Sequence, residues 1–333
     1  MRHFLADDDL SSAEQIQILD LADEFKNQPF RHAVFAGPRS VAVLFDKPTL
    51  RTQASFAAGI AELGGYPMIV DGRLAGIGVR ESIADTARVL SRQCAAIVWR
   101  TFGQDRLEEM AANAGVPVIN ALTDSYHPCQ LLADLQTIRQ HKAALAGLTL
   151  AYVGDGANNM AQSYVLGGAR AGLHVRIGAP AGFLPDAAVL ARAEEAATAS
   201  GGSVTLTDSA VDAVSGSDVV ATDTWVSMGQ ESDGQDRQAI FAAYALTGQL
   251  LSHAAPDAIV LHCLPAYRGK EIAAEVIDGA QSVVWDEAEN RRHVQKAVLA
   301  FLDEMARTGS EPVPRPSSTP TGRGHSPHSG HAS

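Results

Sequence analysis

Short apolar runs rich in β-branched residues alternate along this chain with segments of helical periodicity, and the series occurs twice. In the first half the runs span residues 39–45, 66–71, 95–100 and 116–121. In the second half they span residues 148–153, 174–178, 203–207, 218–222, 258–262 and 282–286. Strands that alternate with helices form parallel sheets buried on both faces. The pattern predicts an α/β protein with two doubly wound parallel-sheet domains linked by helices.

The 333 residues are enough for two domains with separate cores. The second series of strands starts after residues 141–148, so we place the boundary there. We assign residues 1–142 to the first domain and 143–289 to the second.

The C-terminal part divides into a helix and a tail. Val294, Val298 and Phe301 recur at helical spacing, which predicts a helix over residues 290–307 that packs back on the first domain. Residues 308–333 are rich in Pro, Ser and Gly, and we expect them to be disordered. The tail contains three histidines that could bind a metal, but its composition favours a solvated segment. They are His325, His328 and His331.

Composition limits the classes of function. The formal net charge of −12 argues against nucleic acid or an anionic membrane as the main partner. Apolar runs are too short to cross a membrane, and the start of the chain carries three aspartates, so we expect a cytoplasmic protein. The three cysteines are far apart and lack a C-x-x-C spacing, which predicts neither a disulfide framework nor a zinc site.

Parallel sheets bind ligands beyond the carboxyl ends of their strands. After the first predicted strand a helix begins near Pro48 and Thr49, and Arg51 and Thr52 follow. Free N–H groups, the helix dipole and a guanidinium at one helix start suit a phosphate. The alternative is a threonine N-cap beside a solvated arginine. Arg100 ends the third strand and lies at the same edge of the predicted sheet.

A histidine and a glutamine open the helix after the fourth strand. His127 precedes Pro128, a good first helical residue, and Gln130 falls in the first turn. A histidine at a helix start is often only a cap or a packed surface residue. With Arg51 and Arg100 at neighbouring strand ends, these side chains suit one phosphate and an adjacent carbonyl.

The second domain opens with V-G-D-G-A-N-N-M, residues 153–160. The strand–turn–helix context suits a dinucleotide fingerprint, but its third glycine is replaced by Asn159, and no acidic residue follows the next strand. A dehydrogenase is therefore disfavoured. Asn158 and Asn159 offer amides that could hold an amino acid or could simply cap the helix.

Two later strand ends carry an acid and a thiol. Asp223, Ser227 and Met228 follow one strand, and Cys263 and Leu264 follow another. A carboxylate could hold a cationic amine there, and the thiol and a nearby carbonyl could orient a nucleophile. Cys263 as a covalent nucleophile is a weaker alternative, since only the adjacent His262 could serve as a base.

The start of the last helix, D-E-A-E-N-R-R-H, places acids ahead of Arg291. This arginine could point back toward the strand ends. The alternative is a surface ion pair, which is common and contributes little to stability.

Together these motifs resemble the ornithine carbamoyltransferases, over nearly the whole chain up to about Met305. The hallmarks are H-P-C-Q at 127–130, D-T-W-V-S-M-G-Q at 223–230, H-C-L-P-A at 262–266 and E-N-R at 289–291. The resemblance implies a carbamoyl-phosphate domain, an amino-acid domain, and a homotrimer with active sites at subunit contacts. It also implies carbamoyl transfer in arginine biosynthesis, with no metal or organic cofactor.

The resemblance also implies roles for particular residues. One group would hold carbamoyl phosphate: Thr49, Leu50, Arg51, Thr52, Arg100 and Arg291. His127 and Gln130 would lie near the carbamoyl group. A second group would hold an ornithine-like amino acid: Asn159, Asp223, Ser227 and Met228. Cys263 and Leu264 would line its reacting amine. The implied chemistry is direct attack by a neutral δ-amine on the carbamoyl carbon.

Two stretches depart from the family pattern. The usual S-T-R-T-R reads Thr49-Leu50-Arg51-Thr52-Gln53 here. The loop S-x-x-Q-L-G-R-x-E-S, which reaches the phosphate of a neighbouring subunit in the family, would place its glutamine at Gly76 and its arginine at Val79. Arg73 or Arg80 could compensate.

Three hypotheses follow from the intact acceptor motifs and the altered donor motifs. The first is a working ornithine carbamoyltransferase with compensated donor binding. The second is a paralogue of the same fold with a changed donor or acceptor. The third is a non-catalytic binding or regulatory subunit that keeps the amino-acid pocket.

Overall fold

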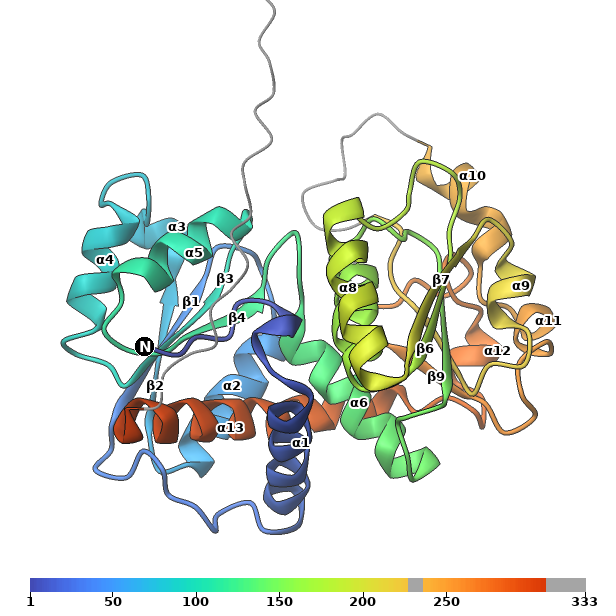
Figure 1. The fold of residues 1–333 in the computed structure, drawn as a ribbon. Helices are drawn as coiled ribbons and strands as arrows, with labels where there is room; N and C mark the ends of the chain where they lie inside the picture. Colours follow the sequence, from blue (N-terminus) through green and yellow to red (C-terminus); the bar gives the residue numbers. More distant parts are fainter. Residues whose placement is uncertain (227–235, 310–333) are drawn as a thin grey trace, which may run out of the picture.

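The computed structural model describes residues 1–226 and 236–309 and contains two parallel sheets, each with helices on both faces (Figure 1). The strand order is β2-β1-β3-β4 in the first sheet and β7-β6-β5-β8-β9 in the second. All pairings between these strands are parallel. The predicted α/β class with two doubly wound parallel sheets is confirmed.

The first sheet comprises β1 (Ser40–Phe45), β2 (Tyr66–Asp71), β3 (Ala96–Arg100) and β4 (Val118–Leu122). Its flanking helices are α1 (Ser12–Asn27), α2 (Arg51–Glu62), α3 (Gly72–Ala75), α4 (Ile83–Leu90) and α5 (Gln104–Asn113). Helix α6 (Pro128–Lys142) leads from this sheet to the second, and Figure 1 shows it between the two.

The second sheet comprises β5 (Thr149–Val153), β6 (His174–Gly178), β7 (Ser203–Thr207), β8 (Val219–Thr222) and β9 (Ile259–His262). Its helices are α7 (Asn159–Ser163), α8 (Ala187–Ser200), α9 (Ala210–Val214), α10 (Arg237–Phe241), α11 (Gly248–Leu251) and α12 (Ala274–Ile277). A π-helical turn (Tyr164–Gly168) continues α7, and 3-10 turns occupy Asp7–Asp9 and Ala242–Tyr244. The last helix, α13, spans Val284–Thr308.

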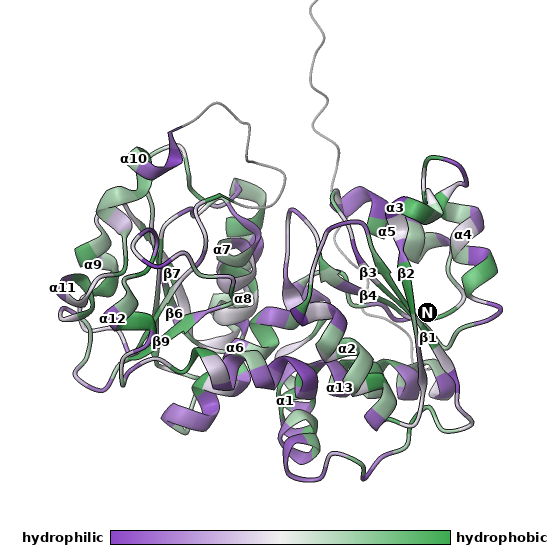
Figure 2. Ribbon diagram, turned by 180° about the vertical axis from the view of Figure 1, so that it is seen from behind, coloured by the Kyte–Doolittle hydropathy of each residue, from purple (hydrophilic) through white to green (hydrophobic). Residues whose placement is uncertain are grey.

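Strands β1 and β3, in the middle of the first sheet, are apolar at consecutive positions because both faces of the sheet are covered there. In β1, Val41 and Val43 pack into the core on one face, and Ala42 and Leu44 pack into the core on the other. Strands of the first sheet are accordingly green in the hydropathy view, whereas β6 and β7 are paler (Figure 2). No helix in the described part of the chain is long and apolar enough to cross a membrane.

One predicted strand is wrong. Of residues 282–286, only Ser282 makes a bridge, to Val260, and α13 begins two residues later at Val284. A short apolar run does not distinguish a strand from a buried helix start. Asp286 and Glu287 fall in the first helical turn, where the helix dipole favours acids. The C-terminal helix therefore starts at Val284 and not at residue 290.

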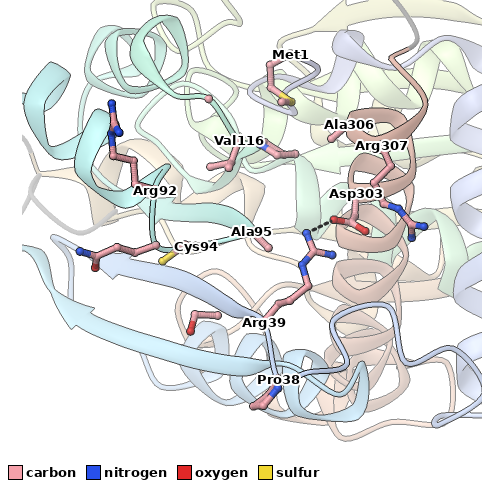
Figure 3. Close-up of a pocket in the computed structure, with 14 residues that line it drawn as sticks. Met1, Pro38, Arg39, Arg92, Cys94, Ala95, Val116, Asp303, Ala306 and Arg307 are labelled. Carbon is pink, nitrogen blue, oxygen red and sulfur yellow. Dashed lines mark hydrogen bonds and ion pairs between the residues drawn. The ribbon is translucent and has the colours of Figure 1, made fainter.

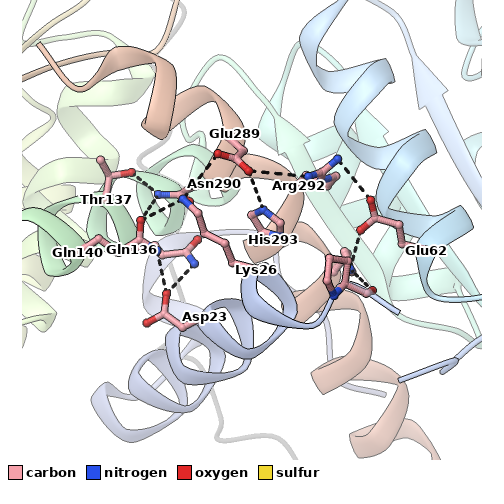
Figure 4. Close-up of polar contacts among 12 residues, drawn as sticks. Asp23, Lys26, Glu62, Gln136, Thr137, Gln140, Glu289, Asn290, Arg292 and His293 are labelled. Atoms are coloured by element: carbon pink, nitrogen blue, oxygen red, sulfur yellow. Dashed lines mark hydrogen bonds and ion pairs between the residues drawn. The ribbon is translucent and has the colours of Figure 1, made fainter. Parts of the chain in front are cut away.

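Helix α13 runs back from the second sheet along α1, α2 and α6 beneath the first sheet (Figure 1). Polar contacts fix it there (Figure 4). Lys26 Nζ donates to Asn290 Oδ1 at 2.8 Å, and Lys296 Nζ donates to Glu62 Oε2 at 2.6 Å. His293 is buried among these groups, and burial lowers its pKa to about 4. The helix thereby carries Arg291 to a fixed position between the sheets.

Each sheet has one point at which the strand order reverses. In the first sheet it lies between β1 and β3, and in the second it lies between β5 and β8. Such switch points open a crevice at the carboxyl ends of the strands. The loops after β1, β3, β5 and β8 therefore surround the expected binding region.

Candidate active site

After β1, Thr49 precedes Leu50, which is the N-cap residue of α2, and the helix begins at Arg51 and not at Pro48. The Thr49 Oγ1 accepts from the Thr52 N–H at 3.3 Å. Arg51 is half-buried, and Thr52 is buried. Leu50, by contrast, is 78% exposed, and its side chain lies outside the buried group that Thr52 joins.

Two arginines from distant elements converge on the hydroxyl of Thr52. Arg291 Nη2, from α13, donates to Thr52 Oγ1 at 2.9 Å, and Arg100 Nη1, from the end of β3, lies 3.5 Å from the same oxygen. Both arginines are buried, and the Nε atom of each has no partner among the described residues. Arg291 is therefore not part of a surface ion pair.

The positive charges act on one another. Burial first, and then the charge of Arg291, lowers the pKa of Arg100 to about 10. Burial also lowers the pKa of Arg291, and Arg51 contributes to the shift of both. Concentrated positive charge with unpaired N–H groups is an arrangement that a bound anion would stabilise.

His127 and Gln130 complete this group at the start of α6. Burial first, and then the charge of Arg291, lowers the pKa of His127 well below its usual range, so its ring is neutral at pH 7. The His127 Nδ1 has no partner among the residues described. Gln130 Oε1 accepts from Arg291 Nη1. We call the six residues the arginine cluster: Arg51, Thr52, Arg100, His127, Gln130 and Arg291.

The second sheet contributes an acid and a thiol. Cys263 Sγ, after β9, donates to Asp223 Oδ1, after β8, at 3.2 Å. Burial raises the pKa of Asp223, and burial with the charge of Asp223 raises the pKa of Cys263 well above its usual value. The sulfur is therefore a thiol and not a thiolate, which argues against Cys263 as a covalent nucleophile.

Asn158, rather than Asn159, lies beside the acid. Asn158 Oδ1 caps α7 by accepting from the Ala161 N–H at 2.9 Å, and its Nδ2 lies 3.5 Å from Asp223 Oδ2. Asn159 Nδ2 donates instead to the Thr123 carbonyl at 2.7 Å, which links α7 to the loop after β4.

The turn after β9 has a constrained backbone. Leu264 has a φ of +58°, a conformation unfavourable for a branched side chain, and its N–H donates to His262 Nδ1 at 2.9 Å. Strain of this kind is typical of functional sites. We call the four residues here the carboxyl–thiol cluster: Asn158, Asp223, Cys263 and Leu264.

The two clusters face a common site between the sheets. Asp223 lies close enough to Arg100 for the charge of its carboxylate to raise the pKa of that arginine. An anion beside the arginines would therefore lie close to an amine held by the acid. Ser227 and Met228, predicted to hold the amino acid, lie outside the described residues.

The loop that departs from the family pattern has its own geometry. Gly76 has a φ of +70°, and a Cβ there would lie 2.9 Å from Arg80 Cγ, so a glutamine at this position would be strained. Val79 is 86% exposed. Arg73 and Arg80 are also exposed in the single chain, and neither is part of the buried arginine cluster.

Sequence reasoning did not single out several buried residues around the clusters. Gln130 Nε2 donates to Asp134 Oδ1 at 2.8 Å and to Glu287 Oε1 at 2.9 Å. The His127 N–H donates to Ser163 Oγ, which in turn donates to Asp7 Oδ2. The available signal was the spacing of four residues from Gln130 to Asp134 and from Glu287 to Arg291, which puts each pair on one helix face.

One group of side chains has the composition of a metal site. Asp223, His262 and Cys263 offer ligand atoms within 4.8 Å of one another. The His262 ring, however, already accepts from Leu264 and lies 3.3 Å from Glu271 Oε1, and the Cys263 thiol keeps its proton. These atoms already have partners within the protein, so the site does not need a metal to satisfy them.

A pocket of about 540 Å³ opens elsewhere, at the amino ends of the first-sheet strands (Figure 3). The ion pair of Arg39 with Asp303 lies in it, and Arg92 and Arg307 extend in different directions from its wall. It is at the opposite end of the sheet from the arginine cluster. Its arginines do not converge on one point.

Family models match both halves of the chain. Residues 2–140 match the carbamoyl-phosphate-binding domain of aspartate/ornithine carbamoyltransferases, and residues 146–302 match the Asp/Orn-binding domain. The chain is similar to a protein of Renibacterium salmoninarum named ornithine carbamoyltransferase, with 61% identity over 309 residues that cover 92% of this chain and 99% of the relative.

Solved structures are similar to this chain over most of its length. The ornithine carbamoyltransferase of Pyrococcus furiosus is 42% identical with a TM-score of 0.87, covering 91% of this chain and 97% of its own. An acetylornithine transcarbamylase complexed with acetylcitrulline is 28% identical with a TM-score of 0.81, covering 91% and 99%. With both domain models matched in order and with these identities, the chain belongs to the aspartate/ornithine carbamoyltransferase family.

Proposed function

We propose that this enzyme transfers the carbamoyl group of carbamoyl phosphate to the side-chain amine of ornithine or a closely similar amino acid. The products are citrulline, or its analogue, and phosphate. The observation that carries the proposal is the convergence of three arginines from α2, β3 and α13 beside a buried acid and thiol.

The arginine cluster is the donor site in this proposal. Arg51, Arg100 and Arg291 bind the phosphate, and their charge stabilises the negative charge that develops as phosphate leaves. Thr52 adds a hydroxyl. Neutral His127 and the amide of Gln130 lie where the carbamoyl group is expected, and both are capable of hydrogen bonding to it.

The carboxyl–thiol cluster is the acceptor site. Asp223 binds the positive end of the amino acid, while the uncharged thiol of Cys263 and the backbone at Leu264 orient the reacting amine. The neutral amine attacks the carbamoyl carbon and forms a tetrahedral intermediate. The carbon–oxygen bond to phosphate then breaks, and the surplus amine proton leaves with the phosphate. Positioning two reactants side by side supplies much of the rate.

Several finer features belong to the same proposal. Residues 1–142 carry most of the donor site and residues 143–289 most of the acceptor site, with α13 supplying Arg291. We also propose a cytoplasmic homotrimer that acts in arginine biosynthesis. Exposed Leu74 and Val79 on the 74–82 loop support a contact with a second copy of the chain, because large apolar side chains at a loop tip favour association.

The test is an assay of citrulline and phosphate release from purified protein supplied with carbamoyl phosphate and ornithine, up to high donor concentration. We expect equal amounts of both products. Absence of citrulline from folded protein would contradict the proposal for ornithine. A subsequent screen of related diamino acids and donors would then identify a paralogue with changed substrates, and failure of every pair would support a non-catalytic binding subunit.

A further inference from the structure

Glu287 lies at the centre of a buried hydrogen-bond network between the two clusters. It is fully buried in the first turn of α13. Its Oε1 accepts from Gln130 Nε2 at 2.9 Å, and its Oε2 accepts from the His262 N–H at 2.8 Å. One carboxyl thus contacts both the start of α6 and the end of β9.

We propose that Glu287 is a positioning residue that fixes Gln130 of the arginine cluster and the 262–264 turn of the carboxyl–thiol cluster relative to each other. The inference rests on the proposed function for its kinetic consequences. Glu287 contacts no substrate in this account. It acts through the groups that it holds.

On the arginine side, Glu287 decides which way the Gln130 amide points. Gln130 Nε2 faces two carboxyls, those of Glu287 and Asp134, while its Oε1 faces Arg291. Reversing the amide would put its NH₂ against a guanidinium and its carbonyl against two carboxyls, and both contacts would lose their hydrogen bonds. The acceptors on one side therefore keep the carbonyl directed at Arg291.

That carbonyl in turn directs Arg291 toward the donor. Arg291 Nη1 is held by Gln130, and Nη2 is then placed 2.9 Å from Thr52 Oγ1. A planar guanidinium fixed at two nitrogens has little rotational freedom left. Glu287 therefore influences the position of Arg291 through Gln130, the member of the arginine cluster to which it hydrogen-bonds.

On the other side, Glu287 fixes the backbone that precedes the Cys263 thiol. The N–H that it holds belongs to His262, and Cys263 and Leu264 follow at once. The His262 ring is held separately by the Leu264 N–H. With the main chain of the turn held from α13, a shift of α13 moves the thiol and Arg291 together.

Asp134 stabilises this arrangement. It is fully buried, hydrogen-bonds with Glu287 and accepts from Tyr164 OH at 2.7 Å. Two adjacent buried carboxyls cannot both be ionised cheaply, so the pair keeps one proton between them. The remaining negative charge lies beside the positive charge of Arg291. A buried charge needs such a partner of opposite sign.

The test uses Glu287→Leu, which keeps the side-chain size and removes both acceptors, and Glu287→Gln, which keeps one acceptor and can donate to Asp134. Glu304→Leu is the matched control, because Glu304 lies on the same helix, α13, and is exposed. The KM of each substrate and kcat are measured for all three, with thermal unfolding to confirm folding.

We expect Glu287→Leu to lower kcat/KM about a hundredfold, since two buried donors lose their acceptor. The KM values of donor and acceptor should both rise, and Glu287→Gln should restore part of the loss. A role confined to stability would lower the melting temperature and leave both KM values unchanged, and that result would overturn the proposal.

Combination with Gln130→Ala sharpens the test. If Glu287 acts on the donor through Gln130, the two losses in donor kcat/KM should be less than additive, whereas independent sites add. Full additivity would overturn the inference.

A binding measurement separates this inference from the proposed function. Calorimetric titration with inorganic phosphate needs no turnover, and we expect weaker phosphate binding in Glu287→Leu than in Glu304→Leu. If wild-type protein forms no citrulline but this difference is found, the proposed function fails and the positioning role stands. Equal phosphate affinity in the two variants would overturn the positioning role, whatever the turnover.

Discussion

The arginine cluster and the carboxyl–thiol cluster bury charge in opposite ways. Arg100 and Arg291 converge on one hydroxyl, and each keeps an Nε without a partner in the described chain. Asp223, in contrast, already accepts from a thiol and from the Thr224 N–H at 2.7 Å. One cluster keeps unused hydrogen-bond donors among the described residues, while the acid of the other already accepts hydrogen bonds.

This difference predicts how strongly each of the two substrates binds. A buried positive site with unused donors gains most when an anion arrives, so the donor should bind tightly to the free enzyme. A satisfied carboxyl gains less, because the incoming amine replaces existing contacts. Substitutions in the arginine cluster should therefore have the larger effects.

The largest expected effect is that of Arg51→Met. Hydrogen bonds to charged groups contribute about 1.5–3 kcal/mol each, so the loss of one or two should lower donor kcat/KM roughly a hundredfold to a thousandfold. The acceptor KM should change little. Steady-state kinetics with each substrate varied in turn provide the measurement, and Arg88→Met, on the exposed face of α4, is the control. An effect mainly on the acceptor KM would contradict the assignment of the clusters.

Asp223→Asn should have the next largest effect. The substitution keeps the shape but removes the charge that binds the acceptor, and we expect acceptor kcat/KM to fall about tenfold to a hundredfold. The exposed Asp212→Asn on α9 is the control. A larger effect on phosphate binding than on acceptor binding would contradict the assignment of Asp223 to the acceptor site.

The pKa of His127 should report on the anion. It is lowered by burial and by the charges of Arg291, Arg100, Arg51 and Lys47. Bound phosphate offsets those charges, so the pKa of His127 should rise when phosphate is added. It should also rise in Arg100→Met, because one of the positive charges is removed. NMR titration of the histidine ring measures this. An unchanged His127 pKa at saturating phosphate would mean that the anion binds elsewhere.

The lowered pKa of His127 also makes the stability of the folded protein depend on pH. The folded pKa of His127 is below the unfolded value, so between these values the unfolded state binds more protons. The contribution of this residue is therefore constant above about pH 6.5, the unperturbed value, and stability is lost as pH falls below it. His127→Gln should flatten the pH dependence of urea unfolding in that range, and an unchanged slope would count against a buried neutral histidine.

The smallest expected effect is that of Leu50→Thr, which restores the usual residue at the altered motif. Because the Leu50 side chain is 78% exposed, we expect donor affinity to change by less than about threefold, or roughly 0.7 kcal/mol. The double substitution Leu50→Thr with Gln53→Arg tests whether the lost charge matters. A large gain in donor affinity would mean that the altered motif weakens the site.

Much of the arrangement was predictable because parallel sheets bring the ends of distant strands to one edge. Arg100, Asp223 and Cys263 were selected for that reason, and the structure places all three around the region between the sheets. Nine of the predicted strands are present with small differences at their ends. The tenth failed because Val283 and Val284 are equally compatible with a helix start.

Other features depend on long-range packing that no local pattern specifies. Glu287 and Asp134 are acids on helices, and in sequence they look like ordinary solvated residues, yet both are fully buried. Asn159, predicted to hold the amino acid, has an Nδ2 that donates to a carbonyl from another loop, a contact that no local pattern specifies. The left-handed backbone at position 76 favours the glycine found there, and no local sequence pattern specifies that conformation.

The most direct test of the central claim is calorimetry with a bisubstrate mimic that joins a phosphonate to an ornithine moiety. We expect tight one-to-one binding per chain to wild-type protein, a large loss of affinity in Arg51→Met and a smaller loss in Asp223→Asn. Absence of binding to folded wild-type protein, or an equal affinity in Arg51→Met, would contradict the claim that the two clusters form one donor–acceptor site.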